Sequence, residues 1–344
     1  MRESGLGRKM RCPGIDPALA WNFGPGQPSI PGMLKPLRSL FLLALCLGSL
    51  RAEEKHRFSF ERPLMGTRFA ITCYGTDGAA AKEAADEAFM KGEEINAIAS
   101  DYIPESELMQ FSQKIGQPVK VSHLMAELLQ ASFAMARSTD GVFDPTLGPL
   151  TKLWRETRKT QKLPDPEVLE AAKAKCGWQD AVWDEEAGTL LLKKPGMQLD
   201  LGGIAKGFTA EKMFEVMAKR GFPQTIIAAG GDLRLGDPPP GREAWRVGLQ
   251  TFDPEEPEEV VELKNCSVST AGDLHQFVEI DGKRYSHIID PKTGLGITNK
   301  VAVSVIAPHG VICDGLDTAA CVIGAEKAEE FAMKRGATRA IVRK

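Results

Sequence analysis

The amino-acid sequence predicts an α+β or α/β fold in which helices pack on mixed, largely antiparallel sheets. Three observations support this prediction. Short segments with alternating apolar residues, typical of strands, recur along the chain. Longer segments with apolar residues three or four positions apart, typical of helices, are interspersed with them. Loops rich in proline and acidic residues, beginning at Asp237 and Asp253, resemble the edges of hairpins.

Three segments carry the pattern of amphipathic helices. Residues 79–99 are rich in alanine, and their apolar positions mark one helical face. Residues 122–137 form the second candidate, with Ser122 as the expected N-cap. Residues 209–219 form the third. Strands are expected at residues 68–74, 226–229, 245–249, 277–280 and 301–306.

Length and composition favour a folded enzyme-sized unit. The 344 residues are 43% apolar, enough for a sizeable core, and no repeat of fixed period is visible. The formal charge of −3 argues against a nucleic-acid footprint, and no basic stripe with interleaved aromatic residues occurs. One folded unit after the N-terminal segment is therefore expected.

The first 52 residues predict a leader. Residues 1–32 are rich in glycine and proline without periodicity, as in a disordered arm or a misassigned start codon. Residues 33–52 place two basic residues before an apolar run and small residues, the pattern of an export signal. That run is too short to span about 30 Å of hydrocarbon as a mature helix. Cys46 leaves open a lipid anchor, although Leu45 is bulky for a lipoprotein signal.

A periplasmic location follows from this leader, with attachment to the inner membrane by an uncleaved leader or a lipid as the alternative. Five of the seven cysteines lie beyond the leader, without a CxxC pair, so neither a complete disulfide framework nor a zinc site is expected. Cys313 and Cys321 lie among apolar residues and are predicted to be small buried side chains.

The segment DLGGIAKG, residues 200–207, has the composition of an anion-binding turn. Gly202 and Gly203 leave the backbone open to a ligand, and Lys206 follows as the next helix begins. Exposed amides at a helix N-terminus bind phosphate, and lysine adds a point charge. Neither a Walker A sequence nor GxGxxG occurs. A plain strand-to-helix turn remains the alternative explanation of the glycines.

The segment CDGLDTAA, residues 313–320, carries oxygen ligands at helical spacing. Asp314 and Thr318 are four apart, so on a helix they share a face at about 5 to 6 Å between Cβ atoms. Asp317 borders that face. Such hard oxygens suit Mg²⁺, which completes its octahedron with water and substrate phosphate. The alternative is helix capping, with Asp314 as N-cap and Asp317 in the first turn.

The segment HIIDPKTG, residues 287–294, joins an imidazole to a turn. Histidine is the one side chain whose unperturbed pKa lies near neutrality. Asp290, Pro291 and Gly294 predict a turn that would orient the ring of His287. From these residues alone, His287 is either a general base or a satisfied residue at a strand end.

Five further glycine-rich or polar segments complete an ordered set: PLMGTRFAIT (63–72), DYIPESEL (101–108), GVFDPTLGPL (141–150), AAGGDLRLG (228–236) and VSTAGD (268–273). With this set the chain resembles the FAD:protein FMN transferase family, the ApbE-like flavin transferases, over about residues 60–343. The resemblance implies an ApbE-like, T-fold-related architecture. It also implies a flavin transferase catalytic domain over residues 58–344.

The resemblance implies the site residues as well. FAD would be bound by Met65, Tyr102, Val142, Phe143, Asp144, Asp200, Lys206 and Ile289. The metal would be bound by Asp314, Asp317, Thr318 and the backbone carbonyl of Gly203. From the residues alone, Phe143 and Ile289 could be plain core, Asp144 a plain turn residue and Tyr102 a surface aromatic.

The reaction implied is Mg²⁺-dependent. A threonine hydroxyl of an acceptor protein attacks the FMN-side phosphorus of FAD, forming a phosphoester bond and releasing AMP, with His287 as general base. The implied acceptor is a redox membrane complex or an exported flavoprotein subunit. An FAD pyrophosphatase yielding FMN and AMP, and a non-catalytic exported flavin-binding protein, remain the alternatives.

One segment departs from the family pattern. Where the family commonly has TSGDY, this chain has TAGDL, with Ala271 and Leu274 in place of a hydroxyl and an aromatic ring. One polar contact and one stacking surface of the substrate site are therefore expected to be absent.

Overall fold

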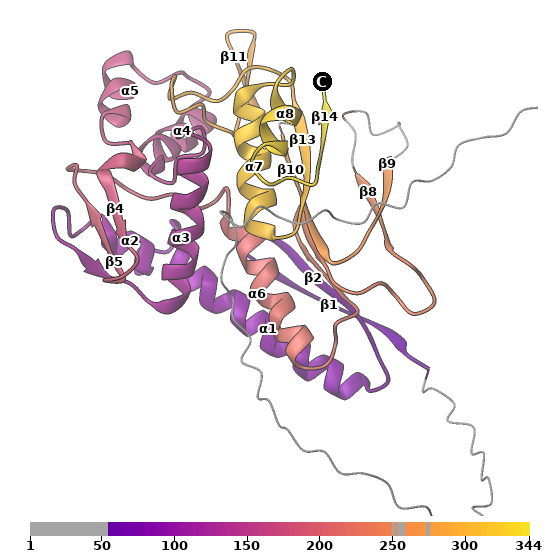
Figure 1. Ribbon diagram of the computed structural model, residues 1–344. Coiled ribbons are helices and arrows are strands. Elements are labelled where there is room, and N and C mark those ends of the chain that lie inside the picture. The colour runs from indigo at the N-terminus through magenta and orange to yellow at the C-terminus, as the bar shows by residue number, and fades with distance from the viewer. Residues whose placement is uncertain (1–53, 250–251, 253–258, 273–275) are drawn as a thin grey trace, which may run out of the picture. The chain divides into compact units, whose positions relative to one another are not determined.

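The centre of the fold is a seven-stranded sheet in which every neighbouring pair is antiparallel (Figure 1). The computed structural model describes residues 54–249, 252, 259–272 and 276–344. The predicted leader, most of the acidic loop at Asp253, and Leu274 lie outside these residues. In spatial order the strands are β1 (His56–Leu64), β2 (Thr67–Gly75), β6 (Thr225–Ala229), β7 (Asp232–Leu235), β10 (Cys266–Gly272), β13 (Ala302–Ala307) and β14 (Arg339–Arg343).

The hairpin between β1 and β2 turns at two residues only. Leu64 pairs with Thr67, and both Met65 and Gly66 have positive φ, at 51° and 71°. A two-residue hairpin turn whose twist matches that of its strands requires positive φ at both central residues. β2 confirms the strand predicted at residues 68–74, whereas β1 was not predicted, because charged residues interrupt its alternation.

Three helices cover one face of this sheet (Figure 1). They are α1 (Gly78–Ala99), α6 (Ala205–Lys219) and α7 (Gly310–Ile323). α1 confirms the predicted alanine-rich helix, and its Ala81, Ala84, Ala88 and Ile95 side chains are buried. α6 begins four residues earlier than predicted, because its first turn contains the glycine that packs against α7.

The opposite face of the sheet is covered by a hairpin of β8 (Trp245–Leu249) and β9 (Glu259–Leu263). β8 confirms the strand predicted at residues 245–249. Trp245, Val247 and Leu249 are buried in alternation and pack with Leu235 and Val268 of the central sheet. The alternation is that of a strand with one buried face.

A second group of elements packs beside α7. It contains α2 (Glu107–Phe111), α3 (His123–Ser138), α4 (Gly148–Thr160), α5 (Pro166–Lys173), the short sheet of β3 (Val119–Lys120), β5 (Thr189–Leu192) and β4 (Ala181–Asp184), and the hairpin of β11 (Phe277–Ile280) and β12 (Lys283–Ser286). Ser122 caps α3 as predicted, accepting from the amide of Met125 at 3.4 Å. α4 was not predicted, since Lys and Arg make its sequence strongly polar.

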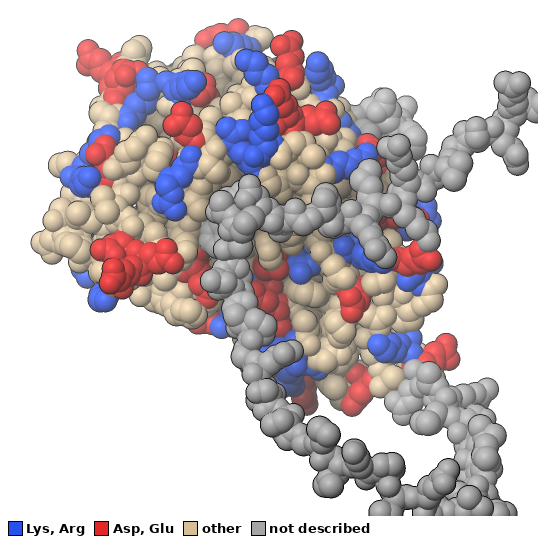
Figure 2. All heavy atoms as spheres, in the orientation of Figure 1, with Lys and Arg blue, Asp and Glu red and all other residues tan. Residues whose placement is uncertain are grey.

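These elements confirm the predicted fold class of helices packed on largely antiparallel sheets. α8 (Ala328–Met333) completes the helices. In the part of the chain that the structure describes, none of the helices is both long and apolar enough to traverse a bilayer. Figure 2 shows Lys and Arg interspersed with Asp and Glu over the visible face. Cys313 and Cys321 are fully buried, as predicted.

Candidate active site

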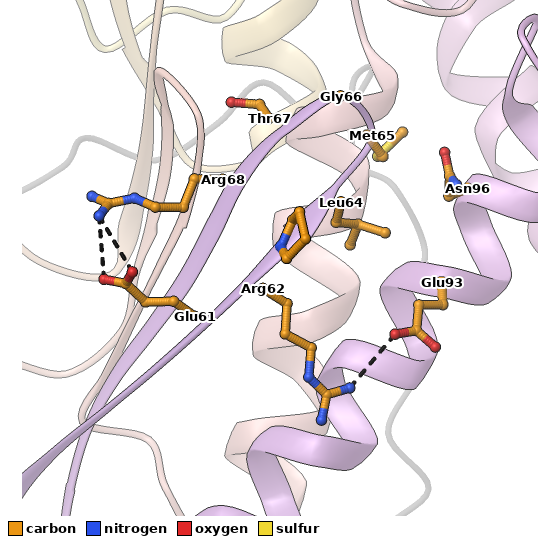
Figure 3. Close-up of a pocket in the computed structure, with 10 residues that line it drawn as sticks. Glu61, Arg62, Leu64, Met65, Gly66, Thr67, Arg68, Glu93 and Asn96 are labelled. Carbon is orange, nitrogen blue, oxygen red and sulfur yellow. Dashed lines mark hydrogen bonds and ion pairs between the residues drawn. The ribbon is translucent and has the colours of Figure 1, made fainter.

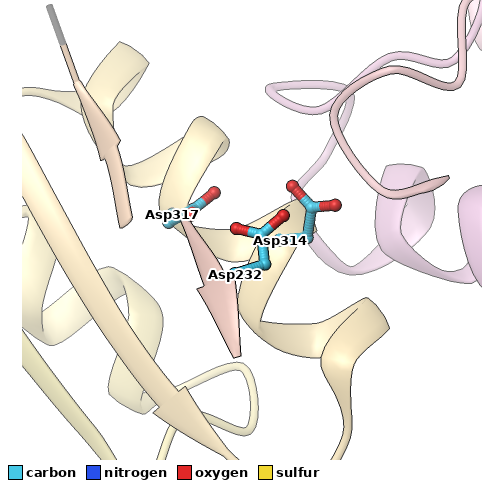
Figure 4. A group of neighbouring side chains, drawn as sticks. All are labelled: Asp232, Asp314 and Asp317. Carbon is cyan, nitrogen blue, oxygen red and sulfur yellow. The ribbon is translucent and has the colours of Figure 1, made fainter. Parts of the chain in front are cut away.

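Three buried carboxylates meet between the central sheet and α7 (Figure 4). One oxygen from each of Asp232, Asp314 and Asp317 lies within 4.8 Å of the other two. Each of the three residues is at most 3% exposed. Burying several carboxylates together is unfavourable unless cations or hydrogen-bond donors compensate them, so the groups around this cluster determine what it can do.

Strand alternation brings Asp232 into the cluster. Along β7, Leu233 and Leu235 point to the face covered by β8 and β9, whereas Asp232 and Arg234 point to the helices. The sequence analysis did not single out Asp232, although it noted the AAGGDLRLG segment. The alternation of that segment is the signal that could have identified it.

α7 begins at Gly310, so Asp314 lies in the second turn of the helix rather than at its start. The capping interpretation of Asp314 and Asp317 is therefore wrong. His309 is the N-cap and makes no side-chain capping bond. The predicted shared face of Asp314 and Thr318 follows from their position in this continuous helix.

Two glycines set the distance between α6 and α7. A Cβ on Gly207 would lie 2.3 Å from the carbonyl oxygen of Gly310, and one on Gly310 would lie 2.2 Å from that of Gly207. Only glycine allows backbones to approach this closely. At the crossing, the Gly207 amide donates to Asp314 Oδ2 at 2.8 Å.

Lys206 supplies the cation of the cluster. Its Nζ lies 2.6 Å from Asp232 Oδ2 and 3.3 Å from Asp314 Oδ1. Burial alone would lower the pKa of Lys206, but the charges of Asp232 and Asp314 outweigh it and hold that pKa far above its usual range. The ammonium is therefore charged at any physiological pH.

Ser269, on β10, joins two of the carboxylates. Its Oγ lies within hydrogen-bonding distance of both Asp232 Oδ1 and Asp317 Oδ2. A hydroxyl has a single proton to donate, so the Ser269 hydroxyl can donate to only one of these two carboxylate oxygens. Burial, together with the charges of Asp314 and Asp232, raises the pKa of Asp317 well above its usual value.

The donor set fits a hard divalent cation. Asp317 Oδ1 is buried and has no hydrogen-bond partner among the described residues. Three carboxylates and one ammonium leave two negative charges when all are ionised, which one divalent ion would balance. Oxygen ligands of this kind are those that Mg²⁺ prefers. The two other predicted metal ligands lie beside the cluster.

Gly203 and Thr318 are those two residues. A Cβ on Gly203 would lie 3.6 Å from Thr318 Oγ1 and 3.4 Å from the ring of Phe143. The structure thus brings together Gly203, Thr318 and the buried Phe143, all predicted site residues. Val142 is partly buried against the same core.

Asp144 is held inside the protein by internal donors. Its Oδ1 accepts from the amide and the hydroxyl of Thr146, at 2.7 and 2.6 Å, and its Oδ2 accepts from the amide of Trp178 at 3.1 Å. Burial outweighs these bonds and raises the pKa of Asp144. These contacts organise a turn; the predicted role in FAD binding stays a prediction.

Asp200 and Tyr102 both interact with Arg155. Asp200 Oδ1 accepts from the amide of Gly202 at 2.8 Å. Tyr102 is 74% exposed, with the guanidinium of Arg155 4.0 Å above its ring. Burial and the nearby charge of Asp200 raise the pKa of Asp101, which pairs with Arg155 at 2.5 Å.

Met65 lines a cleft of about 780 Å³ formed by the β1–β2 turn and α1 (Figure 3). Its positive φ is uncommon for a residue with a side chain. The hydroxyl of Thr209, on α6, donates to the carbonyl of Ala205 at 2.7 Å and lies 3.4 Å from Met65 Sδ. This contact connects the predicted flavin residue to the helix that carries Lys206.

His287 and Ile289 belong to the second group of elements. His287 follows β12, and its amide donates to the carbonyl of Gln276 at 3.0 Å, while its Nδ1 lies 3.2 Å from the same oxygen. The predicted turn is present, with Asp290 Oδ1 accepting from the amide of Lys292 at 2.9 Å. Ile289 is 8% exposed and packs with Leu150 and Trp154.

The similarity to known proteins extends over most of the chain. Residues 65–342 match the ApbE family. An FAD:protein FMN transferase from Salmonella typhimurium strain LT2 is 32% identical over 284 residues, which cover 80% of this chain and 81% of that protein. The crystal structure of the apo form of Pseudomonas stutzeri flavinyl transferase ApbE is similar at a TM-score of 0.74 and 30% identity, covering 83% of this chain and 90% of that one. The flavin transferase ApbE from Vibrio cholerae reaches 0.75 at 29% identity, covering 84% and 93% respectively.

Proposed function

The chain belongs to the ApbE family and is similar to flavin transferases, and on this basis we propose that it transfers FMN from FAD to a threonine of an acceptor protein. The bond formed is a phosphoester between the threonine oxygen and the FMN-side phosphorus. The bond broken is the diphosphate P–O bond, and AMP leaves. The observation that supports this most directly is the buried cluster of Lys206, Asp232, Asp314 and Asp317.

The reaction is proposed to depend on Mg²⁺. Asp314, Asp317, Thr318 and the carbonyl of Gly203 would hold the ion, and the unpartnered Asp317 Oδ1 is the atom that most needs it. When bound, Mg²⁺ would stabilise the negative charge that develops on the diphosphate. Lys206 contributes a second, permanent positive charge from the protein itself.

His287 acts as the general base in this proposal. Its imidazole accepts the proton of the threonine hydroxyl as the oxygen attacks phosphorus, and the proton passes afterwards to solvent. Phosphoryl transfer is catalysed mainly by positioning and charge. The adjoining turn, closed by the Gly294 amide donating to the Asp290 carbonyl at 2.8 Å, holds this segment in place.

FAD itself would extend over the predicted residues around this cluster. Phe143 lies beside Gly203, Met65 lines the cleft at the β1–β2 turn, and Tyr102 contacts Arg155 of α4. Apolar and aromatic side chains with a few polar groups suit an isoalloxazine and an adenosine. Asp144 would act at the same site through its turn.

The protein is further proposed to work outside the cytoplasm. The predicted export signal at residues 33–52 supports a periplasmic location, with an uncleaved leader or a lipid at Cys46 as a means of inner-membrane attachment. An exported flavoprotein subunit or a redox membrane complex would then supply the acceptor threonine. The mass of the mature N-terminus of the native protein tests the processing.

Incubation with FAD, Mg²⁺ and a threonine-bearing acceptor protein tests the activity. The acceptor is expected to gain the mass of an FMN group while AMP appears in equal amount. An unmodified acceptor alongside free FMN would show a pyrophosphatase instead. Retention of intact FAD would show a flavin-binding protein without turnover.

The same assay tests the assigned base. His287→Ala is expected to lose most FMN attachment, by about 10²- to 10⁴-fold, the range typical of a lost general base. His123→Ala is the matched control, because His123 lies at the exposed start of α3. Equal rates for the two variants would remove His287 from the mechanism.

A further inference from the structure

A second cleft, of about 820 Å³, lies between α4 and β11. α4 contributes Lys152, Arg155, Arg158 and Lys159 to its lining. Two of these cations are neutralised within the protein: Lys159 pairs with Glu156 at 2.7 Å, and Arg155 pairs with Asp101 at 2.5 Å. The cleft therefore presents more positive charge than its own acidic side chains balance.

Glu279 is the remaining acidic side chain of the lining, so an excess of one positive charge is carried by Lys152 and Arg158 together. Neither makes an ion pair or hydrogen bond with any residue of the described ranges. Lys152 is exposed and Arg158 is half-buried. Unpaired cations that line a cleft attract ligands of negative charge and orient them as they approach.

The opposite wall of the cleft is the edge of a strand. Phe277, Val278 and Glu279 of β11 all line it, although consecutive side chains of a strand point to opposite faces. The cleft therefore extends along β11, which has one edge that is not paired with β12. Within the described residues β11 pairs with β12 alone, so this edge can accept an additional extended chain.

The cleft adjoins residues that are assigned to the two halves of the proposed reaction, FAD binding and proton removal. In the lining, Arg155 stacks on Tyr102 and interacts electrostatically with Asp200. Tyr102 and Asp200 are both among the residues assigned to FAD. Gln276 directly precedes Phe277 of the lining, and its carbonyl accepts from the amide of His287. A chain lying along β11 would thus pass from the nucleotide toward the assigned base.

We propose that this cleft docks the acceptor protein as an extended, acidic segment that pairs with the edge of β11 and places its threonine near His287. Lys152 and Arg158 would bind carboxylates that flank the threonine, and the exposed Phe277 would contact its apolar side chains. The inference rests on the proposed transfer to threonine and adds the chemistry of the partner.

Three synthetic peptides test the docking, each with one threonine flanked by Asp, by Asn or by Lys. The wild type is expected to attach FMN to the Asp peptide with a kcat/KM about tenfold above that of the Asn peptide, mainly through KM, because two cations favour it. The double variant Lys152→Glu, Arg158→Glu is expected to prefer the Lys peptide. Its dissociation constant for FAD, read from flavin fluorescence, is expected to stay that of the wild type.

Lys162→Glu combined with Lys219→Glu is the matched control. Both lysines are exposed, lie outside the cleft and change the net charge equally, so the Asp preference should persist. Labelling without a charge preference, or a preference that survives the double variant, would overturn the docking alone. Weaker FAD binding in the double variant would overturn it too, assigning the cations to FAD. A wild type that labels no peptide would contradict threonine transfer itself.

Discussion

Lys206 Nζ lies 2.6 Å from Oδ2 of Asp232, a residue 26 positions later in the chain. The contact joins the first turn of α6 to the start of β7 and leaves the ammonium 3.3 Å from Asp314 Oδ1. Both carboxylates are buried and the lysine side chain is half-buried, so the two acids depend on the ammonium for compensation of their charge. The pair is thus the structural link between the predicted phosphate-binding segment and the proposed metal ligands.

Asp232→Asn tests this link. The amide keeps the size of the side chain but removes one negative charge beside Lys206 and the proposed metal. FMN attachment is expected to fall by about 10- to 100-fold, as for groups that orient metal ligands, with a higher half-saturating Mg²⁺ concentration. Asp140→Asn, at an exposed turn, is the control. Unchanged Mg²⁺ dependence would exclude Asp232 from the site.

Gly207→Ala tests the crossing of α6 and α7. The new methyl carbon would lie 2.3 Å from the Gly310 carbonyl oxygen and 2.9 Å from Asp314 Cβ, so the helices must move apart. The free energy of unfolding is expected to fall by about 1 to 3 kcal/mol, the usual cost of overpacking. Denaturant unfolding measures it, and Gly231→Ala is the control, because φ there is not positive and a Cβ would meet only an ordinary contact, at 3.7 Å. No loss beyond that of the control would contradict the close packing.

Glu211→Gln tests a buried network beside the site. Glu211 pairs with Arg234 at 3.0 Å and accepts from the Gly310 amide at 3.1 Å, with His309 Nδ1 at 3.6 Å. Burial would raise the pKa of Glu211, but these partners outweigh it and lower the pKa below 4.5. A lowered carboxyl pKa stabilises the fold above the unfolded value, and this contribution is lost as pH falls through the folded value.

The wild type is therefore expected to lose more stability on acidification below about pH 5 than Glu211→Gln does. Thermal unfolding at a series of pH values measures the difference between the two proteins. Parallel curves would show that Glu211 is not held ionised by its partners. Glu215→Gln, on an exposed part of the same helix, should follow the wild type.

Asp144→Ala tests whether the Asp144 side chain stabilises a turn or contacts FAD. The substitution removes the three acceptor contacts to Thr146 and Trp178. The free energy of unfolding is expected to fall by about 2 kcal/mol, because buried donors lose their partner. Denaturant unfolding without FAD measures this directly. An unaffected stability with weakened FAD binding would instead make Asp144 a pure ligand contact.

Much of the site was predictable because its segments are short and local. The spacing puts Lys206 after a glycine pair and Asp314 with Thr318 on one helical face, whereas their roles as site residues come from the family resemblance, and the cap at Ser122 follows from residue type. Asp232 was missed because its direction depends on which face of β7 the helices cover, a property of the whole sheet. The capping alternative for Asp314 could not be rejected from the sequence, because Gly310, where α7 begins, is a weak helix former and its contact with Gly207 is visible only in the fold.

The divalent-ion dependence of FMN attachment tests the central claim most directly. Asp317 Oδ1 is the buried oxygen without a partner in the described structure, so Asp317→Asn should raise the half-saturating Mg²⁺ concentration by at least about tenfold. Electron paramagnetic resonance of bound Mn²⁺ should show the same loss of affinity without relying on turnover. If both measurements match the wild type while the variant is fully folded, the carboxylate cluster is not the metal site and the proposed mechanism is wrong.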